Sequence, residues 1–325
     1  MKRFRSLLFV PGNQPEWLEK ALATGADGVV LDLEDSVPAC EKVNARRAVR
    51  NILEPWDKEG VPLLVRVNGY DSGMTAGDLE EVIVGGIAGV ILPKVADSHD
   101  MSELDSLLQH FEERSGLPNG RIETPLCIET ARSLRNVYQI AVSSPRIRSL
   151  LLSAGPGGDM ARSVGYQWTK EGLETLYMRS KMIVDARAAG IDHVMIISWW
   201  DLKDLEGLRR DAERNRQLGY EGMAVVHPSH VSIVNEVFTP KAEEISYCER
   251  LLLAFEDAKR AGIGAIAFEG VMVDEAMAVK AKEMLDNFPG SPEHRRKAVE
   301  GRSARNRKSV RKPNRIERAS ARGKS

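Results

Sequence analysis

The chain has 325 residues, and 42% of them are hydrophobic, which is enough for one large core. No apolar run approaches the roughly 20 residues that a transmembrane helix needs, so we expect no membrane span. The formal net charge of −1 averages two unlike parts. Of the chain's 46 basic and 47 acidic residues, 13 and 3 lie between Pro292 and Ser325, which leaves 33 and 44 for the remainder. We therefore expect an acidic folded part followed by a basic tail.

The first residues, MKRFRSLLFVPG, have a basic start and a short apolar run, as a signal peptide has. The run is short and meets Pro11 and Gly12 without a small-residue cleavage site, so we interpret it as a first strand. The three cysteines, Cys40, Cys127 and Cys248, are widely spaced and form no CxxC pair. This usage favours a reducing, cytoplasmic location over a disulfide framework.

Eight short runs rich in Val, Ile and Leu recur along the first 226 residues. Most are apolar on consecutive residues, which is typical of parallel strands buried on both faces. The predicted strands are Ser6–Val10, Gly28–Leu33, Pro62–Val67, Gly89–Pro93, Thr124–Ile128, Ser149–Ser153, His193–Ser198 and Met223–Val226.

Segments with helical spacing separate these strands, for example Pro15–Ala23, Glu174–Ala189 and Leu205–Leu218. Several of them end at a glycine, the usual stop signal of a helix. Eight alternations of strand and helix predict an α/β fold of the TIM (β/α)₈ barrel type over residues 1–240. An open doubly wound sheet is the alternative, and the lack of a GxGxxG turn after the first strand disfavours it.

A small C-terminal appendage or lid is predicted over residues 241–289. It comprises a helical stretch at Lys241–Ala261, a short extended segment at Ala265–Val273 and a helix from Asp274 to about Leu285. Residues 290–325 are rich in Arg, Lys, Ser and Asn and cannot bury enough apolar surface to fold alone, so we predict a disordered tail. A weak electrostatic attraction to nucleic acid is the alternative, and the lack of interleaved aromatic residues argues against base stacking.

In a TIM barrel the chemistry lies at the carboxyl ends of the strands. Five carboxylates follow strands here: Asp32, Glu34, Asp35, Glu129 and Asp159. Converging carboxylates repel one another unless a cation neutralises them. Because the available ligands are oxygens and no Cys or His cluster accompanies them, we predict Mg²⁺, with Mn²⁺ as the alternative.

Some of these polar residues have simpler explanations. Asp35 and Asp201 are equally well explained as helix N-caps. Arg66 ends a buried apolar strand and must be paired, either with a substrate carboxylate or with a rim carboxylate such as Glu34. For His227 we prefer a packed histidine that bonds to the backbone over a catalytic base.

Seven motifs in consistent order over about residues 1–288 resemble the citrate lyase β-subunit and malyl-CoA lyase family, within the HpcH/HpaI aldolase superfamily. They are Arg5–Gly12 (RSLLFVPG), Asp32–Val37 (DLEDSV), Val65–Asn68 (VRVN), Leu92–Val95 (LPKV), Ile128–Ala131 (IETA), His227–Pro228 followed by Val234–Pro240 (VNEVFTP), and Gly270–Asp274 (GVMVD).

The resemblance implies a homo-oligomer of TIM barrels, trimeric or hexameric, that acts on acyl-CoA or related thioesters of hydroxy-dicarboxylic acids. It implies metal ligation by Glu129 and Asp159, a substrate-carboxylate arginine at Arg66, and a catalytic acid/base at Asp274 that reaches in from a neighbouring subunit. We add Asp32, Glu34 and Lys94 as substrate-binding candidates.

The expected function is a Mg²⁺-dependent carbon–carbon lyase that cleaves or forms a malyl-, citramalyl- or citryl-type thioester by retro-Claisen chemistry. A Mg²⁺-dependent 2-keto acid aldolase without CoA and an acyl-CoA thioesterase on the same site remain alternatives. A degenerate, non-catalytic barrel is disfavoured, because Arg66, Glu129, Asp159 and Asp274 are all retained.

The sequence departs from the family pattern in three places. The loop after the sixth strand reads GPGGDM at Gly155–Met160, where relatives carry FGxxDF or FGAEDL. After the seventh strand, Trp199 and Trp200 stand where a smaller or Tyr-containing segment is common, and either lid packing or a narrowed acyl pocket would explain them. Gln14 replaces a basic residue that some relatives carry near the CoA phosphates.

Overall fold

The computed structural model describes residues 3–56 and 60–287. The chain divides into two compact units, the first ending at Phe238 and the second beginning at Thr239. The predicted tail, residues 290–325, lies outside the described residues. Among the helices that are described, none combines the length and the apolar character needed to cross a bilayer.

The first unit is built around eight strands that run parallel to one another. They are β1 (Ser6–Pro11), β2 (Gly28–Asp32), β3 (Leu63–Arg66), β4 (Gly89–Ile91), β5 (Leu126–Ile128), β6 (Ser149–Ser153), β7 (His193–Ile197) and β8 (Gly222–Val225).

The strands follow one another in the order β4-β3-β2-β1-β8-β7-β6-β5, so β1 pairs with both β2 and β8. Two parallel bridges, from Gly89 to Glu123 and from Leu92 to Leu126, join the remaining edges next to β4 and β5. The sheet is therefore a nearly closed barrel, which confirms the predicted TIM-barrel class and excludes the open doubly wound alternative.

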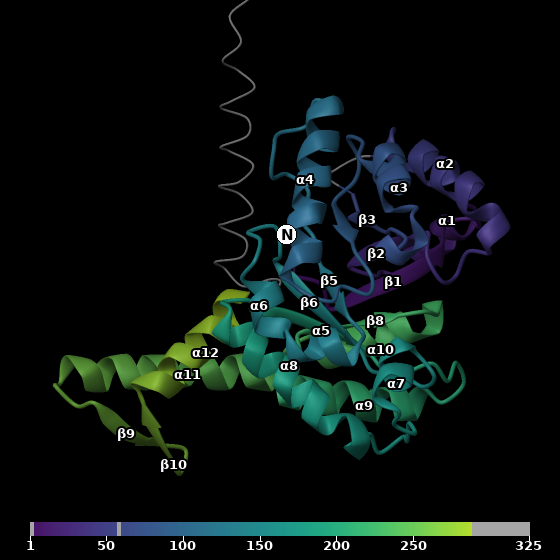
Figure 1. The fold of residues 1–325 in the computed structure, drawn as a ribbon. Helices are drawn as coiled ribbons and strands as arrows, with labels where there is room; N and C mark the ends of the chain where they lie inside the picture. Colours follow the sequence, from purple (N-terminus) through teal and green to yellow (C-terminus); the bar gives the residue numbers. More distant parts are fainter. Residues whose placement is uncertain (1–2, 57–59, 288–325) are drawn as a thin grey trace, which may run out of the picture. The chain divides into compact units, whose positions relative to one another are not determined.

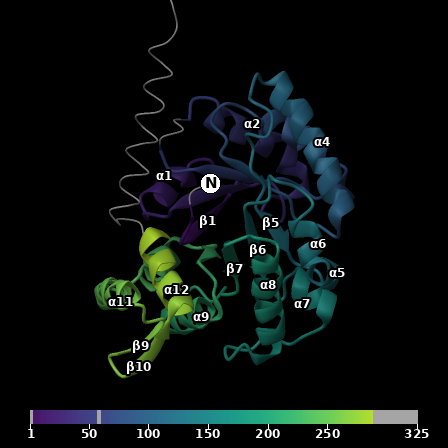
Figure 2. The same cartoon turned by 90° about the vertical axis from the view of Figure 1, so that its left-hand side faces the viewer.

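Helices connect the strands and lie around the barrel, as Figure 1 and Figure 2 show for α2, α4, α6 and α8. The helices of the first unit are α1 (Trp17–Leu22), α2 (Lys42–Leu53), α3 (Thr75–Val82), α4 (Ser98–Arg114), α5 (Ala131–Arg135), α6 (Val137–Ala141), α7 (Asp159–Val164), α8 (Leu176–Ala188), α9 (Leu205–Leu218) and α10 (Pro228–Phe238). Short 3₁₀ turns lie at Ala39–Glu41, Tyr70–Ser72 and Leu173–Thr175.

The sequence signals for α9 show how these helices are bounded. At its start, the Asp204 carboxylate accepts a hydrogen bond of 2.8 Å from the Gly207 N–H, which satisfies one of the free donors of the first turn. At its end, Gly219 adopts a left-handed conformation with φ +103°, where a side chain would be strained. The helix therefore occupies the segment predicted from its spacing and its terminal glycine.

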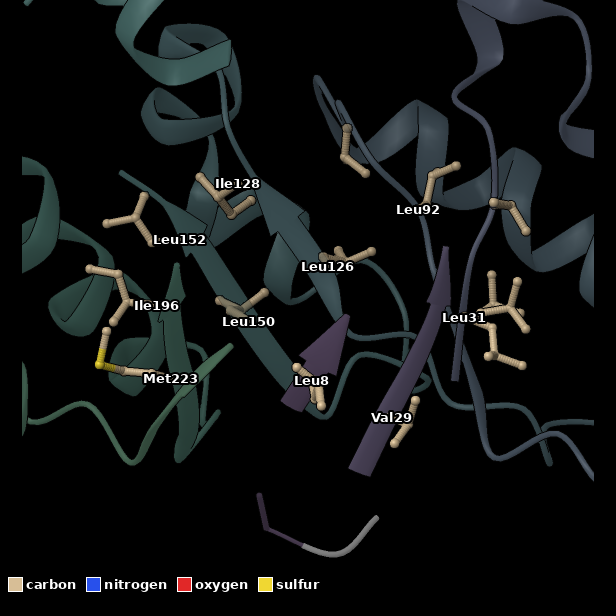
Figure 3. Packing of buried hydrophobic residues seen from close by; sticks show 14 of the residues in the cluster. Leu8, Val29, Leu31, Leu92, Leu126, Ile128, Leu150, Leu152, Ile196 and Met223 are labelled. Carbon is tan, nitrogen blue, oxygen red and sulfur yellow. The ribbon is translucent and has the colours of Figure 1, made fainter. Parts of the chain in front are cut away.

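Because side chains alternate across a strand, each barrel strand has an outward and an inward set. The outward set packs against the helices, and Figure 3 labels members of it from Leu8 of β1 to Met223 of β8. The inward set forms a second buried cluster inside the barrel. Its members on the strands are Leu7, Val30, Leu64, Ile91, Cys127, Leu151, Met195, Ile197 and Ala224.

The second unit consists of α11 (Ala242–Arg260), β9 (Ala265–Phe268), β10 (Val271–Asp274) and α12 (Glu275–Asn287). It has its own small core, which includes Cys248, Leu251, Phe255 and Val273. The extended segment predicted here is in fact a hairpin, because β9 and β10 pair antiparallel across a two-residue turn. Both turn residues, Glu269 (φ +47°) and Gly270 (φ +81°), are left-handed, as tight hairpin turns require.

Candidate active site

A cavity of about 660 Å³ opens at the carboxyl ends of the barrel strands. The alternation of inward and outward side chains along the strands explains which polar side chains reach this cavity. Two residues beyond the inward-facing Val30, Leu64 and Cys127 come Asp32, Arg66 and Glu129, and all three line the cavity. The strands thus place apolar side chains in the barrel interior and charged ones at its upper rim.

Arg66 is held in the cavity by two carboxylates. Its Nε and Nη2 donate to the two oxygens of Asp32 at 2.6 and 2.7 Å, and its Nη1 lies 3.0 Å from Glu34 Oε2. The guanidinium also stacks over the Phe9 ring at 5.1 Å. Asp32 thus occupies one edge of the Arg66 guanidinium. Its terminal nitrogens, Nη1 and Nη2, each have a second N–H that can donate to another carboxylate.

These contacts set the charges of the group. Burial disfavours the charged form of Arg66, but Asp32 and Glu34 outweigh it and raise its pKa above the usual value. Burial likewise raises the pKa of Asp32, but Arg66 outweighs this effect and lowers it. Burial raises the pKa of Glu34, and Arg66 and Lys94 offset the rise only in part. Arg66 and Asp32 are therefore a charged pair, and Asp32 acts by positioning the arginine.

Lys94 links the carboxylates of the rim. Its Nζ lies 2.5 Å from Glu34, 3.6 Å from Asp35 and 3.9 Å from Asp159. Its backbone N–H donates to Glu129 Oε1 at 2.6 Å. Lys94 adopts a left-handed conformation with φ +54°, which costs a non-glycine residue about 1–2 kcal/mol. This conformation lets one residue contact carboxylates with both its amide and its ammonium group.

Glu129 follows β5 and is only 4% exposed. Its partners are weak for a carboxylate at this depth, namely the Lys94 amide and the Cys127 thiol, whose Sγ lies 3.3 Å from Oε2. Burial raises the pKa of Glu129 to about 7, because Arg66 compensates for the lost hydration only in part and Glu34 adds repulsion. A nearby cation would favour the charged form of this carboxylate.

Asp159 is the first residue of α7, directly after the glycine-rich loop. It lines the same cavity as Glu129, and it forms an ion pair with Arg162 one turn further along the helix. Gly157 in the loop has φ +66°, so that position needs a glycine for its backbone conformation. The altered loop therefore still delivers the aspartate to the cavity.

The donor set fits a magnesium ion. Glu129 and Asp159 offer carboxylate oxygens to one cavity, and the incompletely compensated charge of Glu129 calls for a cation. Within the described residues no three Asp, Glu, His or Cys side chains are grouped to hold a metal by themselves. That arrangement suits Mg²⁺, which takes one or two carboxylates and completes its shell with water and substrate oxygens.

Asp274 ends β10 and belongs to the second unit, whereas the cavity residues all belong to the first. Its Oδ1 accepts a hydrogen bond of 3.1 Å from the Met277 N–H, so the side chain caps the start of α12. The role of Asp274 as a catalytic acid/base stays a prediction.

The remaining candidates have local partners. His227 lines the cavity, and its Nδ1 lies 2.8 Å from Ser229 Oγ and accepts from the Ser229 N–H at 3.3 Å. The ring is thus bonded to the backbone of its own turn. Asp201 is exposed and accepts from the Lys203 and Asp204 amides, in the manner of a cap.

Several residues that line the cavity were not candidates from the sequence, among them Ser153, Trp17 and Lys20. Ser153 could have been found, because it continues the inward phase of β6 two residues after Leu151. Trp17 and Lys20 lie one turn apart on α1, and no sequence signal distinguishes them from other surface residues of a helix.

Known proteins are similar to this chain over most of its length. The family model described as HpcH/HpaI aldolase/citrate lyase matches residues 5–228. The citrate lyase subunit beta of Leuconostoc mesenteroides subsp. cremoris is 34% identical over 281 residues, which cover 86% of this chain and 92% of the relative. The (3S)-malyl-CoA thioesterase of Cereibacter sphaeroides is 32% identical over 284 residues, which cover 87% and 93% of the two chains.

Among solved structures, the CitE protein of Mycobacterium tuberculosis in complex with magnesium, acetoacetate and coenzyme A is similar in fold. Its TM-score is 0.69 at 28% identity, and the match covers 88% of this chain and 98% of that one. These matches confirm the resemblance drawn from the sequence motifs. The chain belongs to the HpcH/HpaI aldolase/citrate lyase family.

Proposed function

We propose that the protein is a Mg²⁺-dependent carbon–carbon lyase that cleaves or forms a β-hydroxyacyl thioester of a dicarboxylic acid. In the cleavage direction the bond between the hydroxyl-bearing carbon and the carbon next to the thioester breaks. The hydroxyl loses its proton and becomes the carbonyl of a 2-oxo acid, and the electron pair of the broken bond forms the thioester enolate. Protonation of the enolate carbon completes the reaction.

One observation carries this proposal. Glu129 is a buried carboxylate with a pKa raised to about 7, and it shares a cavity with a second carboxylate, Asp159, and with a paired arginine, Arg66. A metal held by this carboxylate pair, next to an arginine that binds carboxylates, would suit a substrate with adjacent hydroxyl and carboxylate groups. The magnesium in the related CitE complex supports this assignment.

Glu129 and Asp159 would hold the metal. When bound, Mg²⁺ supplies Lewis-acid polarisation of the substrate oxygen and fixes its orientation. Glu129 is held toward the cavity by the Lys94 amide, and Asp159 by its place at the start of α7. Lys94 balances the negative charge of the rim, because its ammonium group lies between Glu34 and Asp159.

Arg66 would bind the carboxylate of the substrate. Asp32 fixes the plane of the guanidinium through two hydrogen bonds, so the remaining N–H groups point in a set direction. A fixed arginine orients its ligand at a smaller entropic cost than a free side chain. We propose Asp274 as the acid that returns the proton to the enolate carbon and as the base in the reverse reaction.

We further propose that the protein acts as a homo-oligomer, a trimer or hexamer, in which Asp274 serves the cavity of a neighbouring subunit. Exposed apolar side chains on the first unit, among them Leu173 and Tyr177, support self-association, because such surface is commonly buried in an interface. Light scattering coupled to gel filtration would give the mass, and a monomer at micromolar concentration would contradict this part.

A thioesterase is the second candidate function, because one relative bears the name (3S)-malyl-CoA thioesterase. In that reaction water attacks the thioester carbonyl and the carbon skeleton stays whole. An aldolase that acts on free 2-keto acids is a third candidate. The replacement of a basic residue by Gln14 is the sequence feature that favours it.

One assay separates the three. Malyl-, citramalyl- and citryl-thioesters and a free 2-keto-3-deoxy acid are each incubated with and without Mg²⁺, and all products are identified by mass. A 2-oxo acid together with a shortened acyl thioester supports the lyase. An intact hydroxy acid together with free thiol supports the thioesterase, and cleavage of the free acid alone supports the aldolase. No carbon–carbon cleavage of any thioester would contradict the proposed function.

A further inference from the structure

The two main departures from the family pattern meet in space. The glycine-rich loop after β6 and the tryptophan pair after β7 lie next to each other at the cavity. A Cβ atom on Gly155 would stand 2.9 Å from the indole of Trp200, and one on Gly158 would stand 3.2 Å from it. Real Cβ atoms almost never approach other atoms within 3.0 Å, so Trp200 occupies the space that a side chain at Gly155 would need. A side chain at Gly158 would require the indole to shift by a few tenths of an ångström.

The backbone does not explain these two glycines. Gly157 has a left-handed φ of +66°, but neither Gly155 nor Gly158 has a positive φ. Gly158 adopts φ −75° and ψ −177°, which any residue tolerates. The close approach of the indole therefore requires the lack of a side chain at Gly155 and is favoured by the lack of one at Gly158.

The two tryptophans have different environments. Trp199 is 3% exposed, packs edge-on against Trp168, and donates from Nε1 to the Asp204 carbonyl at 3.1 Å. Trp200 is 38% exposed and lines the cavity together with Gly158 and Asp159. Trp199 is thus a packing residue, whereas Trp200 presents its ring to the space where a ligand would bind.

We infer that Trp200, with Gly155 and Gly158 as its matched partners, sets the size of the 2-oxo acid fragment that this site accepts. The inference rests on the proposed function. The indole lines the cavity together with Asp159. It therefore limits the size of the substituent on the oxo carbon of the acid, whose oxygen would bind the metal. The protein thus prefers a short 2-oxo acid, and the preference resides in the contact between these two loops.

A double-mutant cycle tests the packing without using activity. The free energy of unfolding is measured for the full chain, Gly155→Ala, Trp200→Ala and the double variant. The destabilisation caused by Gly155→Ala is expected to shrink when the indole is removed, because the new methyl group then has room. The matched control is Gly85→Ala, at a glycine with open space around it and no positive φ, which should show no such coupling. Equal effects of Gly155→Ala in both backgrounds would overturn the packing argument.

Binding of glyoxylate, pyruvate and 2-oxobutyrate to the Mg²⁺-loaded full chain tests the specificity. Trp200→Ala is expected to raise the affinity for 2-oxobutyrate relative to glyoxylate by about 10-fold or more, as a difference of two carbons in an apolar pocket allows. Trp200→Phe should give an intermediate ratio and serves if the alanine variant does not fold. Gly85→Ala should leave the ratio unchanged.

An unchanged ratio in both Trp200 variants, with normal binding by the parent chain, would overturn this inference alone. Failure of the parent chain to bind any of the three acids with Mg²⁺ would contradict the proposed function as well. The two failures are therefore distinguishable.

Discussion

The substitution Glu129→Gln is expected to stabilise the metal-free protein at neutral pH. The ordinary pKa of a glutamate is 4.5, and burial raises that of Glu129 to about 7. A raised pKa means that the folded state favours the protonated form. The contribution of protonated Glu129 to the free energy of unfolding is therefore complete below pH 4.5 and is lost as the pH rises through 7. Glutamine has nearly the shape of the protonated acid and carries no charge at any pH.

The magnitude follows from the size of the shift. The gap between 4.5 and about 7, at about 1.4 kcal/mol per pKa unit, corresponds to about 3 kcal/mol. The variant should therefore be more stable than the parent by up to about 3 kcal/mol at pH 8, and the difference should vanish near pH 4.5. The groups that face Glu129 are Arg66, Glu34, the Lys94 amide and Cys127, and all are retained in the variant.

Urea unfolding in the presence of EDTA, at pH values from 5 to 8, measures this difference. Glu112 provides a control of opposite sign. Burial raises its pKa, but Arg146 outweighs this effect and lowers it, so the charged carboxylate makes its full contribution to stability above pH 4.5. Glu112→Gln should therefore be less stable than the parent by an amount that stays nearly constant from pH 5 to 8. A Glu129→Gln variant that is less stable than the parent at pH 8, or a difference independent of pH, would show that burial does not raise the pKa of Glu129 in this way.

Three further predictions concern the rim and the second unit. Asp32→Ala leaves the Arg66 guanidinium without its bidentate partner and should lower the free energy of unfolding by about 3–5 kcal/mol in urea; a loss below about 1 kcal/mol would contradict this. Lys94→Met removes an ammonium 3.9 Å from Asp159 and should tighten Mg²⁺ binding by about fivefold in calorimetry, because one unit charge at that distance contributes about 1 kcal/mol even in water. Weaker binding would show that Lys94 organises the site and does not compete with the metal. Asp274→Asn should lower turnover by about 10²–10⁴-fold with an unchanged Mg²⁺ affinity, and retained turnover would remove the residue from the mechanism.

The sequence predicts the barrel well because its strands are buried on both faces. Consecutive apolar residues bounded by glycine and proline mark such strands, and β6 occupies the predicted Ser149–Ser153 segment. The observed strand ends differ from the predicted ones where a strand reaches the polar rim. Pro93, for example, was predicted in the fourth strand, but β4 ends at Ile91, since the chain turns there to place Lys94 in its left-handed conformation.

The charged floor of the site is also readable from the sequence. Asp32, Arg66 and Glu129 continue the inward alternation of their strands, so their convergence follows from the barrel alone. The sequence allows two partners for Arg66, a substrate carboxylate or a rim carboxylate. Its bidentate contact is with Asp32, directly across the paired strands β2 and β3, where Asp32 and Arg66 are in register.

Other features depend on contacts between loops, which no local pattern encodes. The packing of Trp200 on Gly155 joins segments that are 45 positions apart in the chain, and neither segment predicts the other. The β9–β10 hairpin could have been predicted, because Glu269 and Gly270 separate two short extended runs. The position of a loop side chain, in contrast, depends on the sum of many weak contacts.

The most direct test of the proposed metal site is a crystal structure of the protein grown with Mg²⁺ and pyruvate. We expect a metal ion about 2.0–2.1 Å from carboxylate oxygens of both Glu129 and Asp159, with the 2-oxo acid completing its coordination and Arg66 bonded to the acid's carboxylate. A metal bound elsewhere, or pyruvate bound in the cavity without a metal, would contradict it.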